Sequence, residues 1–86
     1  MKIQPVKLKV SAGQANYIRD LKIHESQEEI ERNEEYSVFT FNLRPEFDFQ
    51  QEILKNGEEV EVLEPQRLRE EIAGKIKRMS DSYKED

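Results

Sequence analysis

The run from Gly57 to Arg69 places a turn, a strand, a stop and a helix start in immediate succession. Gly57 tolerates the positive φ at which many helices end. Val60 and Val62 alternate with glutamates, the period-two pattern of a strand with one buried face. Pro65 has no backbone N–H, so it ends a strand ladder and suits the first turn of a helix. The run contains no pattern of catalytic residues, so we interpret it as a structural segment.

The composition predicts one small domain with a thin core. Of the 86 residues, 35% are hydrophobic and 38% are charged, a balance that approaches the composition of disordered chains. The apolar residues recur with strand and helix periods, however, and this favours a folded domain with a solvated surface. We therefore expect a single domain over residues 1–86 whose tail, at 84–86, frays.

Several classes of function are disfavoured by what the chain lacks. It contains no cysteine and one histidine, a poor ligand set for a metal and one that excludes thiol nucleophiles and disulfides. The net charge of −5 disfavours general binding to nucleic acid, because phosphate contacts dominate that affinity. No apolar run is long enough to span a membrane. We expect no enzyme, no metal, no cofactor and a cytoplasmic location.

Periodicity predicts strands within 6–10, 27–32, 36–43 and 59–63, and helices after Ser11, after Pro45 and from 66 to about 83. Ser11 and Gln14 form the S-x-x-Q signature of a capping box. We expect crossover helices to join parallel, neighbouring strands, with a hairpin between the two units. This order predicts an α+β fold, a ferredoxin-like βαββαβ sandwich with an additional C-terminal helix.

One core is expected between the sheet and its two crossover helices. Its predicted members are Val6, Leu8, Val10, Ile18, Leu21, Phe39, Phe41, Phe49, Ile53, Val60 and Val62.

A basic group on and beside the first strand is the candidate ligand or partner contact. Its members, with one aromatic residue, are Lys7, Lys9, Arg19, Lys22, His24 and Tyr36. Open sheets bind single-stranded nucleic acid when aromatic rings stack bases over a basic field. Here the outward face would also carry Glu59 and Glu61, so cross-strand Lys–Glu pairing is the interpretation we favour. For the histidine we favour a loop residue that hydrogen-bonds the backbone.

The last predicted helix carries an apolar stripe. It consists of Leu68, Ile72, Ile76, Met79 and Tyr83, at spacings that place them on one face. Because two crossover helices already cover one face of the sheet, this third helix must cover another surface or contact a second chain. We expect self-association through the stripe or through the open sheet face. Glu71 and Lys75 are spaced for a direct i, i+4 pair on the same helix.

Three segments together resemble one known family. The pattern G-x-x-V-x-V-L-x-P-x-x-L-R from Gly57, the segment His24-Glu25-Ser26-Gln27 and the first strand are similar to parts of a single module. That module is the C-terminal (WCX-type) extension of the WYL-domain bacterial helix-turn-helix transcriptional regulators. Tyr83, near the end of the last helix, also fits this resemblance.

The resemblance implies a non-enzymatic regulatory and dimerisation module that relays ligand sensing to a helix-turn-helix domain absent from this sequence. Its implied partners are the WYL domain of the same or a partner chain and a second copy, with DNA bound only through the missing domain. Two alternatives stay open. One is a direct sensor of single-stranded nucleic acid or nucleotides, and the other is a small-molecule-binding domain of similar fold.

Overall fold

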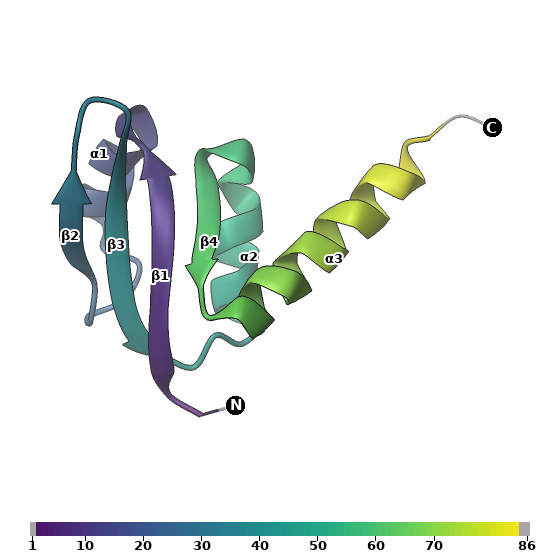
Figure 1. The fold of residues 1–86 in the computed structure, drawn as a ribbon, viewed down its shortest axis with the longest axis horizontal. Helices are drawn as coiled ribbons and strands as arrows, with labels where there is room; N and C mark the ends of the chain where they lie inside the picture. Colours follow the sequence, from purple (N-terminus) through teal and green to yellow (C-terminus); the bar gives the residue numbers. More distant parts are fainter. Residues whose placement is uncertain (1, 85–86) are drawn as a thin grey trace.

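A computed structural model describes residues 2–84 of the chain (Figure 1). Within them the fold is α+β, with a four-stranded antiparallel sheet and three α-helices. The elements in chain order are β1 (Gln4–Ser11), α1 (Ala12–Leu21), β2 (Glu28–Arg32), β3 (Tyr36–Leu43), α2 (Phe47–Lys55), a 3-10 turn (Gly57–Glu59), β4 (Val60–Glu64) and α3 (Gln66–Ser82). The expected fraying at 84–86 falls mostly on residues outside the described part.

The strands lie in the order β2-β3-β1-β4, and every neighbouring pair is antiparallel. The expectation that each crossover helix joins neighbouring strands was wrong. β3 lies between β1 and β2, and β1 lies between β3 and β4, so each helix passes over one intervening strand. The reason is that antiparallel ladders pair slightly more strongly than parallel ones, and β1 can pair along its whole length with β3. Both crossover helices lie behind the sheet in Figure 1.

The predicted core forms, with one exception. The buried cluster contains Val6, Leu8, Val10, Ala15, Ile18, Phe39, Phe41, Leu43, Phe49, Ile53, Val60, Val62, Leu68 and Ile72. Leu21 was expected there but is 48% exposed. It is the last residue of α1, where Lys22 takes a left-handed conformation (φ 52°) and turns the chain away. Ile23, just after this turn, packs against the core instead.

The predicted capping box does not form. Ser11 is the residue before α1, but its side chain makes no cap hydrogen bond to the helix. Its hydroxyl donates to the Glu59 carboxylate, and the Gln14 amide donates to the side chain of Asn56. The helix start is instead held by the Ala12 N–H, which donates to the carbonyl of Glu35 at 3.0 Å. Both polar side chains therefore join the start of α1 to the turn before β4.

Helix α3 belongs to the domain only at its base. Leu68 and Ile72 are buried in the core cluster, whereas Ile76 and Met79 are each 53% exposed and Tyr83 is 87% exposed. Figure 1 shows the helix leaving the end of β4 and projecting away from the sheet as an arm. Within residues 2–84, no helix is long and apolar enough to cross a membrane.

The two phenylalanines of β3 test this packing. Phe39→Ala or Phe41→Ala is expected to lower the free energy of unfolding by about 3–5 kcal/mol, because each removes a fully buried ring. Urea denaturation measures the change. Phe47→Ala is the matched control, since Phe47 is 65% exposed and should cost less than about 1 kcal/mol. Equal losses for the buried and the exposed ring would contradict the packing described.

Candidate functional site

The two lysines of β1 lie on the open face of the sheet, and both have local partners. Lys7 Nζ is 3.0 Å from Glu64 Oε2. Lys9 Nζ lies 4.7 Å above the centre of the Tyr36 ring, and its backbone is opposite Glu61 in the β1–β4 ladder. The Tyr36 hydroxyl donates to Glu31 at 2.8 Å, and this hydrogen bond raises the pKa of the tyrosine. The open face is thus a set of paired charges with one aromatic ring already covered.

The other predicted contact residues lie elsewhere. Arg19 binds Glu29 in a two-pronged ion pair between α1 and β2, with both N···O distances 2.7 Å. Glu29 shares the helix-covered side of the sheet with its cross-strand neighbour Phe39. Lys22 lies at the end of α1, where its backbone N–H donates to the Ile18 carbonyl. The structure therefore places Lys7, Lys9 and Tyr36 together on the open face. Arg19 and Lys22 lie away from them.

The histidine segment closes the connection between α1 and β2. The Ser26 N–H donates to His24 Nδ1 at 3.1 Å, and the Ser26 hydroxyl, 2.7 Å from the same nitrogen, accepts a hydrogen bond from the Asn42 N–H. The Gln27 side chain donates to the Ile18 carbonyl at 3.0 Å and accepts from the Ile23 N–H at 2.9 Å. These polar side chains satisfy backbone groups at the end of α1, in the turn after it and on β3. Their role in this structure is to hold the turn between α1 and β2 in place.

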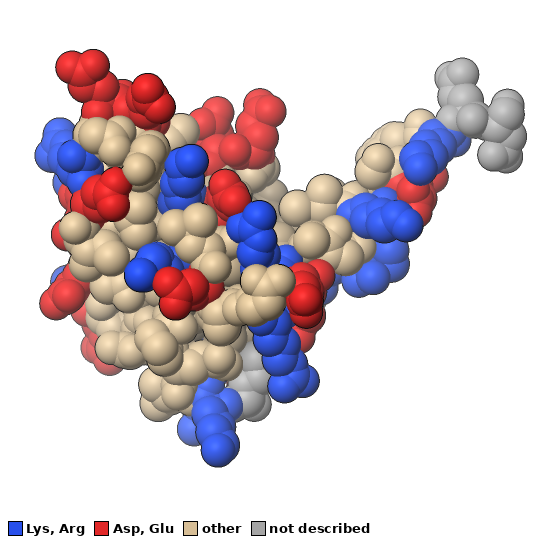
Figure 2. All heavy atoms as spheres, viewed as in Figure 1, with Lys and Arg blue, Asp and Glu red and all other residues tan. Residues whose placement is uncertain are grey.

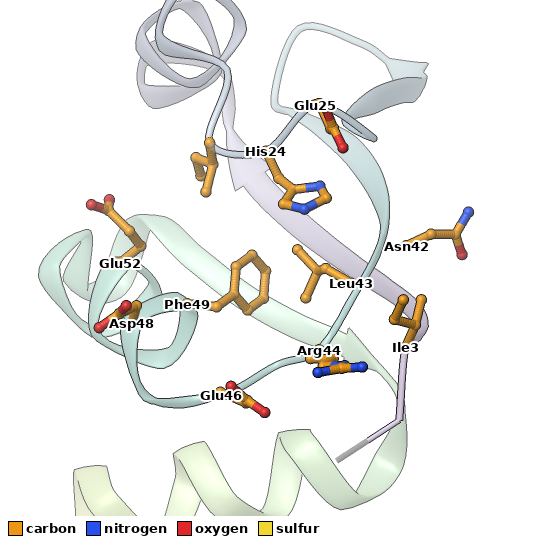
Figure 3. A pocket seen from close by; sticks show the side chains of 11 residues that line it. Ile3, His24, Glu25, Asn42, Leu43, Arg44, Glu46, Asp48, Phe49 and Glu52 are labelled. Carbon is orange, nitrogen blue, oxygen red and sulfur yellow. The ribbon is translucent and has the colours of Figure 1, made fainter.

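A shallow groove of about 540 Å³ lies beside this turn (Figure 3). His24, Leu43 and Phe49 line its interior, and Arg44 lies on one side. Carboxylates from two segments surround it: Glu25, Glu46, Asp48 and Glu52. Within the described part of the chain, no three histidine or acidic side chains are grouped to hold a metal ion. The groove has mixed charge at its rim and an apolar floor.

Sequence reasoning missed Gln50, the residue that joins α2 to the arm. It is 4% exposed, and its amide nitrogen donates to the Pro45 carbonyl at 3.0 Å and to Glu71 Oε2 at 2.8 Å. Lys75 Nζ donates to its amide oxygen at 2.6 Å. The expected Glu71–Lys75 pair is thus bridged by Gln50. The signal was weak because a polar residue adds nothing to the apolar period from which the helix was predicted.

A second anchor holds the base of the arm to the edge of the sheet. Arg69 Nη1 donates to Glu61 Oε2 and to the Val62 carbonyl, each at 2.7 Å. A guanidinium on a backbone carbonyl of an edge strand satisfies a group that would otherwise be available for pairing with another chain. Together with the buried Leu68 and Ile72, these contacts give α3 a fixed direction.

An apolar groove of about 530 Å³ runs between α2, β4 and α3. Its walls are Ile53, Leu54, Val60, Ile72, Ile76 and Met79, and its rim includes Glu58 and Arg69. The exposed part of the α3 stripe forms one wall, so the stripe and the groove are one continuous apolar surface. We call it the arm surface, and it is an exposed apolar surface beside a groove, of the kind that marks binding sites in general.

The Arg19–Glu29 pair predicts a pH dependence of stability. Hydrogen bonds from Arg19, and from Ser37, lower the pKa of Glu29 from 4.5 to about 2. A lowered folded-state pKa stabilises the fold above the unfolded pKa, and this contribution is lost as the pH falls from about 4.5 through about 2. Glu29→Gln should therefore cost about 1 kcal/mol at pH 7, the upper end for surface ion pairs.

Urea denaturation of the wild type and of Glu29→Gln, between pH 7 and pH 2, measures the free energy of unfolding that the substitution removes. The difference should shrink towards the acid end, because the wild-type carboxylate becomes protonated there. Glu34→Gln, at an exposed turn position, is the control and should change little at either pH. A cost for Glu29→Gln that is the same at both ends would contradict the role given to this ion pair.

A comparison with protein-family models gives the context for these contacts. The model of the WCX domain matches residues 2–80, nearly the whole chain. No curated protein matches the chain. The match covers all four strands and most of α3, so the family includes both the sheet and the helix that forms the arm. The chain belongs to the WCX domain family.

Proposed function

We propose that this domain is a non-enzymatic regulatory and interaction module of a WYL-type transcription regulator, and that it acts through the arm surface. Membership of the WCX family supports the regulatory context. The observation that carries the proposal is that α3 is anchored firmly at its base and apolar where it leaves the domain. The sheet order β4-β1-β3-β2 supports the finer assignment to the ferredoxin-like fold.

The anchors suggest how a signal would pass. A partner that moves α3 must also move Gln50 on α2 and Glu61 on β4, because both are bonded to the helix. A displacement at the arm is therefore passed to the core instead of being absorbed by a flexible joint. In a regulator, this couples the contact between protomers or domains to the position of the DNA-binding part.

Direct sensing of single-stranded nucleic acid is the alternative, and the open face gives it little support. Lys7 is paired with Glu64, and Lys9 lies over the one aromatic ring that a base would need. A small molecule would have to bind the shallow groove beside His24, where acidic side chains surround an apolar floor. Neither surface combines free positive charge with free aromatic faces, as base stacking requires.

A titration separates the sensor from the interaction module. Fluorescence anisotropy with labelled oligo(dT) at physiological salt should show binding no tighter than about 100 µM, which is the weak end of non-specific affinities. The double variant Lys7→Glu, Lys9→Glu should leave the signal unchanged. Submicromolar binding that this double variant abolishes would establish the sensor in place of our proposal.

The coupling is tested in an intact regulator that carries this domain. DNA is first selected from a random pool by that regulator, and its affinity is then measured for the wild type and two glutamine variants. Gln50→Ala removes the bridge between α2 and α3 and should change the affinity about fivefold or more, the low end of coupling between distant sites. Gln51→Ala, an exposed neighbour, should leave it unchanged. Identical affinities for all three proteins would contradict the relay.

A further inference from the structure

Fixed apolar side chains form the floor of the groove beside the turn between α1 and β2, which we call the His24 groove. Leu43 and Phe49 make this floor, and both are almost fully buried. The Phe49 ring is held edge-to-face against Phe41, with ring centroids 5.5 Å apart. The Ser26 N–H donates to His24 Nδ1 at 3.1 Å, and Figure 3 shows the imidazole directed over the floor. The groove is therefore preformed, as most small-molecule sites are.

The rim of the His24 groove is acidic. It carries the carboxylates of Glu25, Glu46, Asp48 and Glu52, and Arg44 is the one lysine or arginine of the described residues that lines it. The imidazole adds no positive charge, because its Nδ1 accepts a hydrogen bond and so carries no proton. Figure 3 shows two of the carboxylates on the α2 side and the guanidinium away from them. A cleft lined mainly by one sign of charge attracts the opposite sign.

The stability of α2 accounts for only part of this acidic rim. Asp48 lies in the first turn of α2 and Glu46 just before it, where the helix dipole favours negative charge. Glu52 follows Asp48 by four residues, a like-charge spacing that destabilises a helix, and its ion pair with Lys55 is long, at 3.8 Å. Glu25 forms no ion pair within residues 2–84. The dipole thus leaves the last two carboxylates unexplained.

We propose that the His24 groove binds a small organic cation with an apolar body. The body lies on the floor, and the ammonium group faces the carboxylates of Glu25 and Glu52. Within the described part of the chain the carboxylates are not grouped to hold a metal ion, so a larger, organic cation is the better match. The volume of about 540 Å³ lies in the range of small-molecule sites. The site is separate from the arm surface and does not depend on the proposed function.

A neighbouring groove provides a contrast in charge within the same molecule. It has a volume of about 430 Å³ and shares Ile3 with the His24 groove, but it is lined by Lys2 and Arg67. Its one carboxylate, that of Glu71, already accepts a hydrogen bond from Gln50. A ligand with the same apolar body and a negative charge should therefore avoid the His24 groove and prefer its neighbour.

Titrations followed by two-dimensional amide NMR test the charge and the apolar body separately. Tryptamine carries an indole ring and an ammonium group, indole-3-propionate carries the same ring with a carboxylate, and ethylammonium lacks the ring. Tryptamine should shift the amides of residues 23–26 and 43–49 with a dissociation constant of roughly 1 mM or below, as its size allows. The other two probes should bind there about fivefold more weakly or less, because each lacks one of the two contacts.

Paired substitutions test the rim. Glu25→Gln combined with Glu52→Gln should weaken tryptamine binding about threefold to tenfold, because two facing carboxylates are lost. Glu34→Gln combined with Glu58→Gln changes the net charge equally but lies outside the groove, and should leave the affinity unchanged. Arg44→Gln should strengthen the binding about twofold, because it removes the opposing charge. The same spectra show whether each variant is folded.

Four results would overturn the proposal. They are tryptamine shifts that do not saturate by about 10 mM, ten times the expected constant, equal affinities for tryptamine and indole-3-propionate, and equal losses in the two paired variants. The fourth is ethylammonium binding as tightly as tryptamine, since the apolar floor would then contribute nothing. Saturable shifts confined to the arm surface would likewise contradict the site.

Discussion

The apolar face of the central strand pair, β1 and β3, is the contact on which the rest of the domain depends. Val6, Leu8 and Val10 lie beside Phe39 and Phe41, and all five are almost fully buried. Both crossover helices can bury their own apolar residues only against this face. The third helix joins this core with Leu68 and Ile72 alone of its apolar stripe.

Helix α3 therefore meets the domain at an edge of the sheet instead of at a face. Its first two turns complete the core with Leu68 and Ile72, and polar contacts from Arg69 and Gln50 fix its direction. Beyond Ile72 the helix leaves the core, yet it continues with Ile76 and Met79, which are half exposed beside the apolar groove. The proposed interaction rests on this feature, an apolar stripe that continues after the helix has left the core.

Periodicity alone predicts much of this fold, because alternating and helical spacings report directly on which side chains are buried. Phe39 and Phe41 were placed correctly because a period of two puts both on one face of the strand. The pairing of the strands was not, since the pattern of one strand does not specify its neighbour. Leu21 was misplaced because it is the last residue of α1, where the chain turns away at Lys22. The capping role of Ser11 was wrong because its hydroxyl binds a distant residue, Glu59. Gln50 and Arg69 act across elements, and such contacts leave no periodic trace.

The central claim is that the outer half of α3 is exposed in one copy and covered in an assembly. Hydrogen–deuterium exchange of the chain at low and at high concentration tests it most directly. We predict that amides of residues 67–73 are protected at both concentrations, because this part of the helix is packed on its own core. Amides of residues 75–82 should gain protection only at high concentration. Equal protection of the outer half at both concentrations would contradict the account.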